Sequence, residues 1–159
     1  MDAISRLPAD RPIVTLVGEI DCGYLIWSRA AARATSPEAE LRRSVRSYLD
    51  LLDEVEHEGH ANLIVCAVPY PTLETYSNER RSVTATLEER MNITSAFNDQ
   101  LRGWCDRHGA RYLSYDCVLD HQTRRVRSEF HHRDSFDHHY RTAALGPVIA
   151  NELHNMGFR

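Results

Sequence analysis

The sequence predicts an α/β domain built on a parallel sheet, and three observations support this. Three short segments that read as strands alternate with three longer segments whose apolar residues recur every three or four positions. Residues typical of helix caps and helix ends bound the longer segments. Strands that alternate with helices pair in parallel through right-handed crossovers. The 159 residues have the length of one domain, which we place at 12–159 after an N-terminal extension over 1–11.

The strands are expected at 12–18, 62–68 and 111–117. The second segment is a continuous apolar run, which suits a strand covered on both faces. The first ends in Gly-Glu-Ile-Asp at residues 18–21, so it delivers acidic groups to its carboxyl end. Open α/β sheets bind their ligands in the crevice outside these ends. A polar, Ala-rich connection is expected from there to residue 36.

The first helix is expected at 37–58. Ser36 is a typical N-cap, Pro37 suits the first helical position, and Gly59 is a natural C-terminal stop. The buried face of this helix is predicted from apolar residues at helical spacing, namely Leu41, Val45, Tyr48, Leu52 and Val55.

Two further helices are expected at 84–108 and 141–157. Thr86 and Glu89 have the spacing of a capping box near the start of the first, and Gly109 closes it. The helix expected at 141–157 follows a histidine-rich segment and carries apolar residues at helical spacing.

The first strand is expected at an edge of the sheet, because three parallel strands leave two edges open. An exposed apolar edge strand invites pairing with another chain. We therefore predict a homodimer, or a partner chain, that covers residues 13–17.

Composition excludes several classes of protein. The formal net charge of −4 argues against a nucleic-acid-binding protein. No segment approaches the ~20 apolar residues of a membrane helix, and the first eight residues lack the apolar core of a signal peptide. We expect a cytoplasmic protein with no nucleic-acid or membrane partner.

The cysteines are expected to be buried free thiols. Cys22, Cys66, Cys105 and Cys117 show no Cys-x-x-Cys spacing, and cysteine packs as a small hydrophobic residue. Cys22 follows the acidic strand end, so it is the one thiol that could face a site.

The segment 131–139 is the densest in candidate site residues and holds four of the nine histidines. One hypothesis is acid–base chemistry by a histidine that a carboxylate orients, with Asp134 four residues before His138. A second is metal binding, which needs ligands from two or more segments. Candidate ligands are His131, His132, His138, His139 and the two aspartates, Asp134 and Asp137. A third is a solvated loop in which Asp137 caps the last helix.

Further candidates lie on other elements. Glu19 and Asp21 would point to the same side of an extended chain, where they could polarise a histidine or hold a ligand hydroxyl. They could equally cap a helix or pair with arginine. Asn98 lies on the inward face of the second helix and either ties down a loop carbonyl or contacts substrate. We expect the segment around His138 to fold back against residues 19–21.

Several matches together resemble one enzyme family. They are Gly18-Glu-Ile-Asp-Cys22, the strand ending in Pro69, Phe97-Asn98 in the second helix, and Asp134 to His139 before the last helix. In order and spacing these segments are similar to the SGNH (GDSL-type) hydrolase superfamily, over residues 12–157. The resemblance implies a three-layer, flavodoxin-like parallel sheet with an active site at the strand ends.

The resemblance also implies roles for individual residues. His138 matches the catalytic histidine, with His139 as the runner-up, and Asp134 matches its carboxylate partner. Gly18 matches a glycine of the oxyanion block. From their own positions in the chain, Glu19, Asp21 and Asn98 are the further candidates for contacts to substrate. Ile20 stands where the family has asparagine. The Gly-Asp-Ser block that carries the nucleophilic serine is absent, so the chain looks like the C-terminal portion of such a domain, without its first strands.

The favoured hypothesis is therefore an esterase-like hydrolase that acts on a small-molecule or glycan ester and needs no cofactor. It would use a His–Asp pair without the usual serine. The alternatives are a metal-binding protein and a non-catalytic partner subunit.

Overall fold

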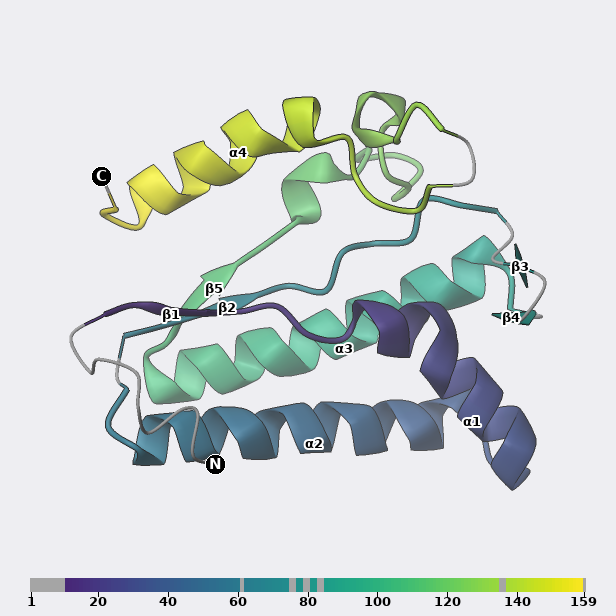
Figure 1. The fold of residues 1–159 in the computed structure, drawn as a ribbon, viewed down its shortest axis with the longest axis horizontal. Coiled ribbons are helices and arrows are strands. Elements are labelled where there is room, and N and C mark those ends of the chain that lie inside the picture. The colour runs from purple at the N-terminus through teal and green to yellow at the C-terminus, as the bar shows by residue number, and fades with distance from the viewer. Residues whose placement is uncertain are drawn as a thin grey trace.

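Three parallel strands form the sheet at the centre of the molecule. The computed structural model describes residues 11–60, 62–74, 77–78, 81–82, 85–134 and 137–158. The strands are β1 (Ile13–Thr15), β2 (Leu63–Cys66) and β5 (Arg111–Leu113), in the order β1-β2-β5. Both pairs are parallel, so the predicted α/β class with a parallel sheet is confirmed (Figure 1).

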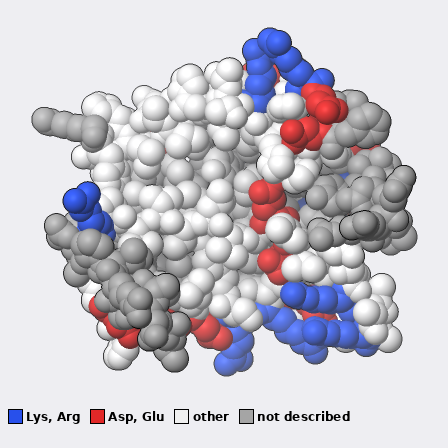
Figure 2. Space-filling view, in the orientation of Figure 1, with Lys and Arg blue, Asp and Glu red and all other residues white. Residues whose placement is uncertain are grey.

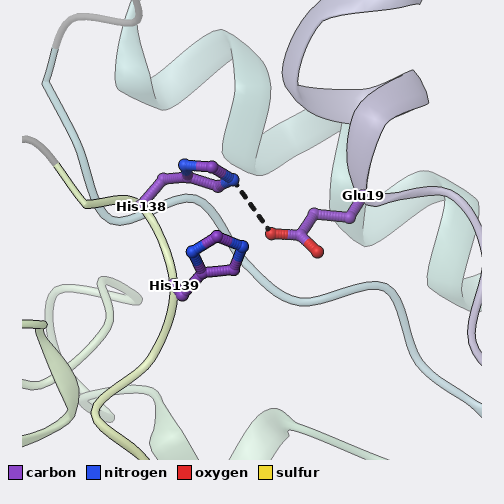
Figure 3. A group of neighbouring side chains, drawn as sticks. All are labelled: Glu19, His138 and His139. Carbon is purple, nitrogen blue, oxygen red and sulfur yellow. Dashed lines mark ion pairs between the residues drawn. The ribbon is translucent and has the colours of Figure 1, made fainter.

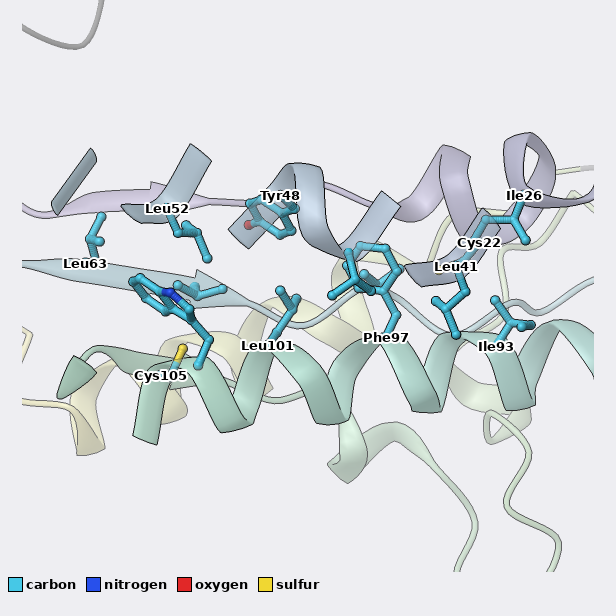
Figure 4. Close-up of a cluster of buried hydrophobic side chains, with 14 of the residues drawn as sticks. Cys22, Ile26, Leu41, Tyr48, Leu52, Leu63, Ile93, Phe97, Leu101 and Cys105 are labelled. Atoms are coloured by element: carbon cyan, nitrogen blue, oxygen red, sulfur yellow. The ribbon is translucent and has the colours of Figure 1, made fainter. Parts of the chain in front are cut away.

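Helices cover both faces of this sheet. Helices α2 (Pro37–His57) and α3 (Leu87–His108) lie on one face, and α4 (Thr142–Asn155) lies on the other (Figure 1). Side chains of β2 alternate between them. Leu63 and Val65 belong to the core of α2 and α3, shown in Figure 4, whereas Ile64 and Cys66 pack with residues of the α4 segment, namely Ile149, Leu153, Met156 and Phe158.

The predicted capping residues lie at the helix ends, although α3 begins at Leu87 rather than at the expected residue 84. The Ser36 hydroxyl accepts a hydrogen bond from the Ala39 N–H at 3.2 Å. Thr86 and Glu89 form the full capping box, and the chain leaves α3 through Gly109 with φ of +67°. Each cap satisfies backbone groups that the first or last turn leaves without a helical partner, so these signals define the start of α2 and the start and end of α3.

The connection expected up to residue 36 is wrong, because that segment is helical. A π-helical turn, η1 (Asp21–Leu25), continues into α1 (Ile26–Arg33). Three apolar residues four apart (Cys22, Ile26 and Ala30) are buried along it. They form a helical stripe, but no side chain caps the start of either helix. The missing cap explains why the sequence did not indicate a helix here.

The strands are shorter than the predicted ranges of seven residues, with three residues in β1, four in β2 and three in β5. Instead of extending β5 to residue 117, the chain forms a 3₁₀ turn, η2 (Asp116–Val118), and a second, η3 (Ser128–Phe130), follows. A short antiparallel pair, β3 (Ser77–Asn78) and β4 (Arg81–Ser82), lies between β2 and α3. Cys117 consequently lies in a turn and is exposed, against expectation, whereas the other three cysteines are buried free thiols.

The predicted edge position of β1 is confirmed by the strand order. Val14 is 57 % exposed and Leu16 is 52 % exposed. The expected N-terminal extension falls almost wholly on residues 1–10, which lie outside the described residues. A second chain over residues 13–17 remains a prediction. Within the described ranges, none of the helices combines the length and the apolar character needed to cross a bilayer.

Candidate functional site

Glu19 and His138 meet at the carboxyl end of β1. Nε2 of His138 lies 3.6 Å from Oε1 of Glu19, and the two side chains are 34 % and 36 % exposed. Glu19 follows β1, and His138 lies in the turn before α4, so segments far apart in sequence converge here (Figure 3). The prediction that the histidine-rich segment folds back against the acidic strand end is confirmed.

Gly18 sets the direction of the chain as it reaches Glu19. Its φ of +111° lies in a region that L side chains rarely adopt. A Cβ at this position would lie 2.6 Å from Cγ2 of Val68 and 3.3 Å from the Phe97 ring. Its carbonyl accepts a hydrogen bond from the Cys22 N–H at 2.8 Å. The glycine therefore lets β1 pass close to the loop after β2 and turn directly into a helix.

Asp21 does not join Glu19 in the site, and the expectation that both would face the same side is wrong. Its carboxylate accepts a hydrogen bond from the Ser44 hydroxyl at 3.0 Å and pairs with Arg29 at 3.5 Å. Residues two apart lie on opposite sides of a helix rather than on the same side of a strand. Because the chain is already helical at Glu19, Asp21 points toward α1 and α2.

Asn98 holds the loop after β2. Its Oδ1 accepts from the Val68 N–H at 2.7 Å, and its Nδ2 donates to the Val68 carbonyl at 3.0 Å. The side chain is 3 % exposed. The structure therefore shows the loop-anchoring alternative for this residue, rather than the exposed amide that a substrate contact requires.

Tyr140 anchors the same loop from the other side, and sequence reasoning missed it. Its hydroxyl accepts from the Tyr70 N–H at 2.7 Å and donates to the Tyr70 carbonyl at 3.0 Å. Thr72 donates its hydroxyl to the His138 carbonyl at 3.1 Å. These bonds fix the turn that carries His138 against the loop after β2. No local pattern marks them, because each joins residues more than 60 positions apart.

Tyr140→Phe is expected to lower the free energy of unfolding by about 2 kcal/mol. Two buried backbone groups of Tyr70 lose their hydrogen-bond partner, while the packing of the ring is kept. Urea unfolding measures this loss. Tyr112→Phe is the matched control, since its hydroxyl donates only a long bond of 3.4 Å to the Asn98 carbonyl. Equal losses in both variants would contradict the anchoring role.

Tyr70 also connects the loop to Asp116, the first residue of η2 after β5. The Tyr70 hydroxyl donates to Asp116 at 2.8 Å, and Arg102 pairs with the same carboxylate at 2.6 Å. Partial burial raises the pKa of Asp116, but the hydrogen bonds from Tyr70, Arg102 and Ser114 outweigh it and hold the pKa below its usual value.

Asp116→Asn is expected to reduce the fall in the free energy of unfolding that wild type shows toward acidic pH. Because the folded-state pKa lies below the unfolded value of about 3.9, the carboxylate stabilises the fold above that pH and loses this effect as pH falls through the folded pKa. The variant is therefore less stable than wild type at pH 7, by under about 1 kcal/mol for a half-exposed pair. Urea midpoints at pH 7 and pH 3 test this: a difference that persists unchanged at pH 3 would contradict it.

The histidine-rich segment is divided between different partners. Asp137 pairs with Nδ1 of His139 at 2.6 Å and with Nδ1 of His132 at 3.5 Å. Nε2 of His131 lies 3.0 Å from the Val126 carbonyl. The main-chain N–H of Asp134 donates to Nδ1 of His132 at 3.2 Å. These contacts do not bring His131 and His132 to a common point, so they do not support the predicted role of the two residues as ligands of one metal ion.

Asp137 is not the cap of the last helix, as one hypothesis held, because α4 begins after Arg141. Its carboxylate accepts from the His139 N–H at 2.9 Å. That hydrogen bond, followed by the bond to the His139 ring, holds the pKa of Asp137 below its usual value. Asp137 is therefore a carboxylate that orients His139.

A different set of ligand atoms does converge. One donor atom each from Glu19, His138 and His139 lies within 4.8 Å of the others. The rings of His138 and His139 lie with their centroids 4.1 Å apart and their planes tilted by 33°. In Figure 3 each ring turns a nitrogen toward the Glu19 carboxylate. We call these three residues the Glu–His–His cluster.

The Glu–His–His cluster lies at the edge of an apolar groove. The groove has a volume of about 470 Å³ and runs between the end of β1 and α4. Its apolar lining includes Leu16, Tyr115, Leu145, Ile149 and Leu153. Figure 2 shows that most of the surface between β1 and α4 carries no charged side chain. A smaller cavity of about 40 Å³, lined partly by His138 and Thr72, adjoins it.

Cys22 borders the small cavity but is not a nucleophile in this structure. It is 2 % exposed, and burial raises the pKa of its thiol far above the usual value, so the reactive thiolate is disfavoured. Among the described residues that line the groove there is no serine or cysteine. The reactive groups at the groove mouth are therefore the imidazoles and the carboxylate.

In comparisons with known proteins, no family model, no curated protein and no solved structure matches this chain.

Proposed function

We propose that this protein is a hydrolase that cleaves a small-molecule or glycan ester with water activated at the Glu19–His138 pair. The observation that carries the proposal is the position of this pair at the mouth of an apolar groove. Pockets with an apolar lining and a few convergent polar groups are the usual sites for small ligands.

A fold of the flavodoxin-like SGNH type is part of this proposal. Two features support it. The Glu19–His138 pair lies beyond the carboxyl end of a parallel strand, where open α/β sheets bind ligands. Gly18 also makes the close approach described above, which suits a glycine of a ligand-binding block.

The chemistry follows from what an imidazole beside a carboxylate can do. At 3.6 Å the two groups are too far apart for a direct hydrogen bond, and a water molecule at the pair could contact both. His138 takes one proton of this water as its oxygen attacks the ester carbonyl. Glu19 stabilises the imidazolium that forms. The proton then passes to the departing alkoxide, which leaves as an alcohol beside the carboxylic acid.

The experiment is hydrolysis of an ester panel by the purified protein. Acetyl, butyryl and octanoyl nitrophenyl esters and an acetylated saccharide cover the substrate class. Release of acid above the uncatalysed rate with at least one ester is expected. A protein that hydrolyses none of them would contradict the proposal and favour a non-catalytic role.

A further inference from the structure

We propose that the Glu–His–His cluster binds a divalent transition-metal ion of the zinc class. This inference rests on the proposed function for its chemical consequence, but not for the binding itself. It deepens that function by naming a metal ion as the group that activates the water.

The spacing of the donor atoms is close to that of a metal site. Zinc binds imidazole nitrogen and carboxylate oxygen at about 2.0–2.1 Å, so tetrahedral ligands lie roughly 3.3 Å from one another. Nε2 of His138 and Oε1 of Glu19 are 3.6 Å apart, and the three donor atoms all lie within 4.8 Å. Small side-chain rotations would bring all three to coordination distance.

Asp137 supplies independent support, because it orients His139 as metal-bound histidines are oriented. A histidine ligand usually donates its second ring N–H to a carboxylate or carbonyl, which fixes the tautomer. Nδ1 of His139 lies 2.6 Å from Asp137. This contact leaves Nε2 with the lone pair, and Figure 3 shows a nitrogen of His139 turned toward Glu19.

The donor set determines which ion fits and what remains open. Two imidazoles and one carboxylate favour zinc and similar ions over magnesium and calcium, which prefer oxygen ligands. Three protein ligands leave a fourth tetrahedral position, as in catalytic zinc sites with two histidines and a glutamate. The groove borders Glu19, His138 and His139, so this position is accessible to water and to a substrate in the groove.

A metal ion would change the role of His138. The lone pair of Nε2 can accept a proton or bind the ion, but not both. With the ion bound, the coordinated water would release its proton to bulk solvent, since zinc lowers the pKa of bound water to about 7. The remaining hydroxide would attack the ester carbonyl, the C–O bond to the alkoxide would break, and the alkoxide would take a proton from the new carboxylic acid and leave as an alcohol beside a carboxylate.

A second group of possible ligands, Asp53, Glu56 and His108, is a weaker candidate. All three residues are exposed. The His108 ring is already engaged, with Nδ1 at 2.7 Å from Glu56 and its face stacked on Trp104. This second group serves as an internal control, because it offers a histidine with carboxylates away from the groove.

The experiment is a calorimetric titration of chelator-treated protein with ZnCl₂. One ion per chain is expected, with affinity lowered at least tenfold in Glu19→Gln and in His139→Ala. Asp137→Asn should weaken binding about 10- to 100-fold, and His108→Ala should bind as wild type does. Co²⁺ in place of zinc should give the intense visible absorption of a tetrahedral site. No saturable binding, or unchanged affinity in both cluster variants, would overturn the inference.

Activity measurements separate this inference from the proposed function. Zinc binding at the cluster without ester hydrolysis would support the metal site and contradict the hydrolase. Ester hydrolysis that persists after complete removal of metal would support the hydrolase and contradict a metal-activated water.

Discussion

Replacing His138 with alanine is expected to lower kcat/KM for ester hydrolysis by about 10²- to 10⁴-fold, the usual contribution of a positioned acid–base group. The loss should fall on kcat, because His138 activates the attacking water, either as its base or as a ligand of the ion that binds it, while the apolar groove holds the substrate. The variant should fold normally, since the side chain is 34 % exposed. Initial rates with the best ester of the panel give the measurement, and circular dichroism confirms the fold.

His57→Ala is the matched control for this variant. His57 is the last residue of α2 and is exposed, and it lies beyond the opposite end of the sheet from Glu19. Its replacement should leave kcat/KM unchanged within a factor of two. A His138→Ala enzyme that keeps more than half of the wild-type rate would exclude this histidine from the chemistry. Equal losses in both variants would indicate a general effect of removing histidine.

Replacing Asn98 with alanine is expected to lower the free energy of unfolding by about 3–5 kcal/mol. The amide makes both hydrogen bonds to Val68, which is fully buried. Removing it leaves a buried N–H and a buried C=O without partners, each costing about 1–3 kcal/mol. The cavity left beside the loop after β2 adds to this cost. Such a loss is a large share of the typical stability of a domain.

Urea unfolding of Asn98→Ala tests this expectation, with Asp99→Ala as control on the exposed side of the same helix. The control should change stability by under about 0.5 kcal/mol, as surface substitutions usually do. A loss below about 1 kcal/mol in Asn98→Ala would mean that the loop finds other partners for Val68. Because Val68 also lies next to Gly18, Asn98→Ala should make the position of the neighbouring Glu19 less fixed as well.

The parts of the fold that could be predicted are those with local chemical signals. Ser36, the Thr86–Glu89 pair and Gly109 each act on backbone groups within a few residues, so their effect is visible in sequence. The apolar run of β2 likewise indicated a strand covered on both faces. The helix from Glu19 to Arg33 lacks a side-chain cap at its start. It is stabilised instead by tertiary contacts, namely the burial of its apolar stripe against α2 and α3 and the polar contacts of Asp21 and Arg33.

The two segments that form the candidate site could be predicted, because the topology of a parallel sheet places them at the same edge. Glu19 follows a strand and His138 precedes a helix, and parallel strands bring such ends to one edge of the sheet. Which carboxylate would lie beside His138 was not predictable. Asp134 was the nearer candidate in sequence, but Glu19 is the carboxylate whose ion pair with His138 the structure shows. The anchoring roles of Tyr140 and Thr72 depend on contacts across the fold.

The sequence by itself determined the α/β class, the order of the three sheet strands and of the three longest helices α2, α3 and α4, and the two segments that meet at the site. It could do so because caps, apolar periodicity and parallel pairing depend on neighbouring residues or on simple topology. Only the tertiary structure decided that Glu19 faces His138 while Asp21 turns away. It also decided that His139 lies beside Glu19 and His138, with its ring oriented by Asp137. Those outcomes depend on side-chain direction, and a helical turn at residue 19, stabilised by distant packing, rotates each carboxylate to a different side of the molecule.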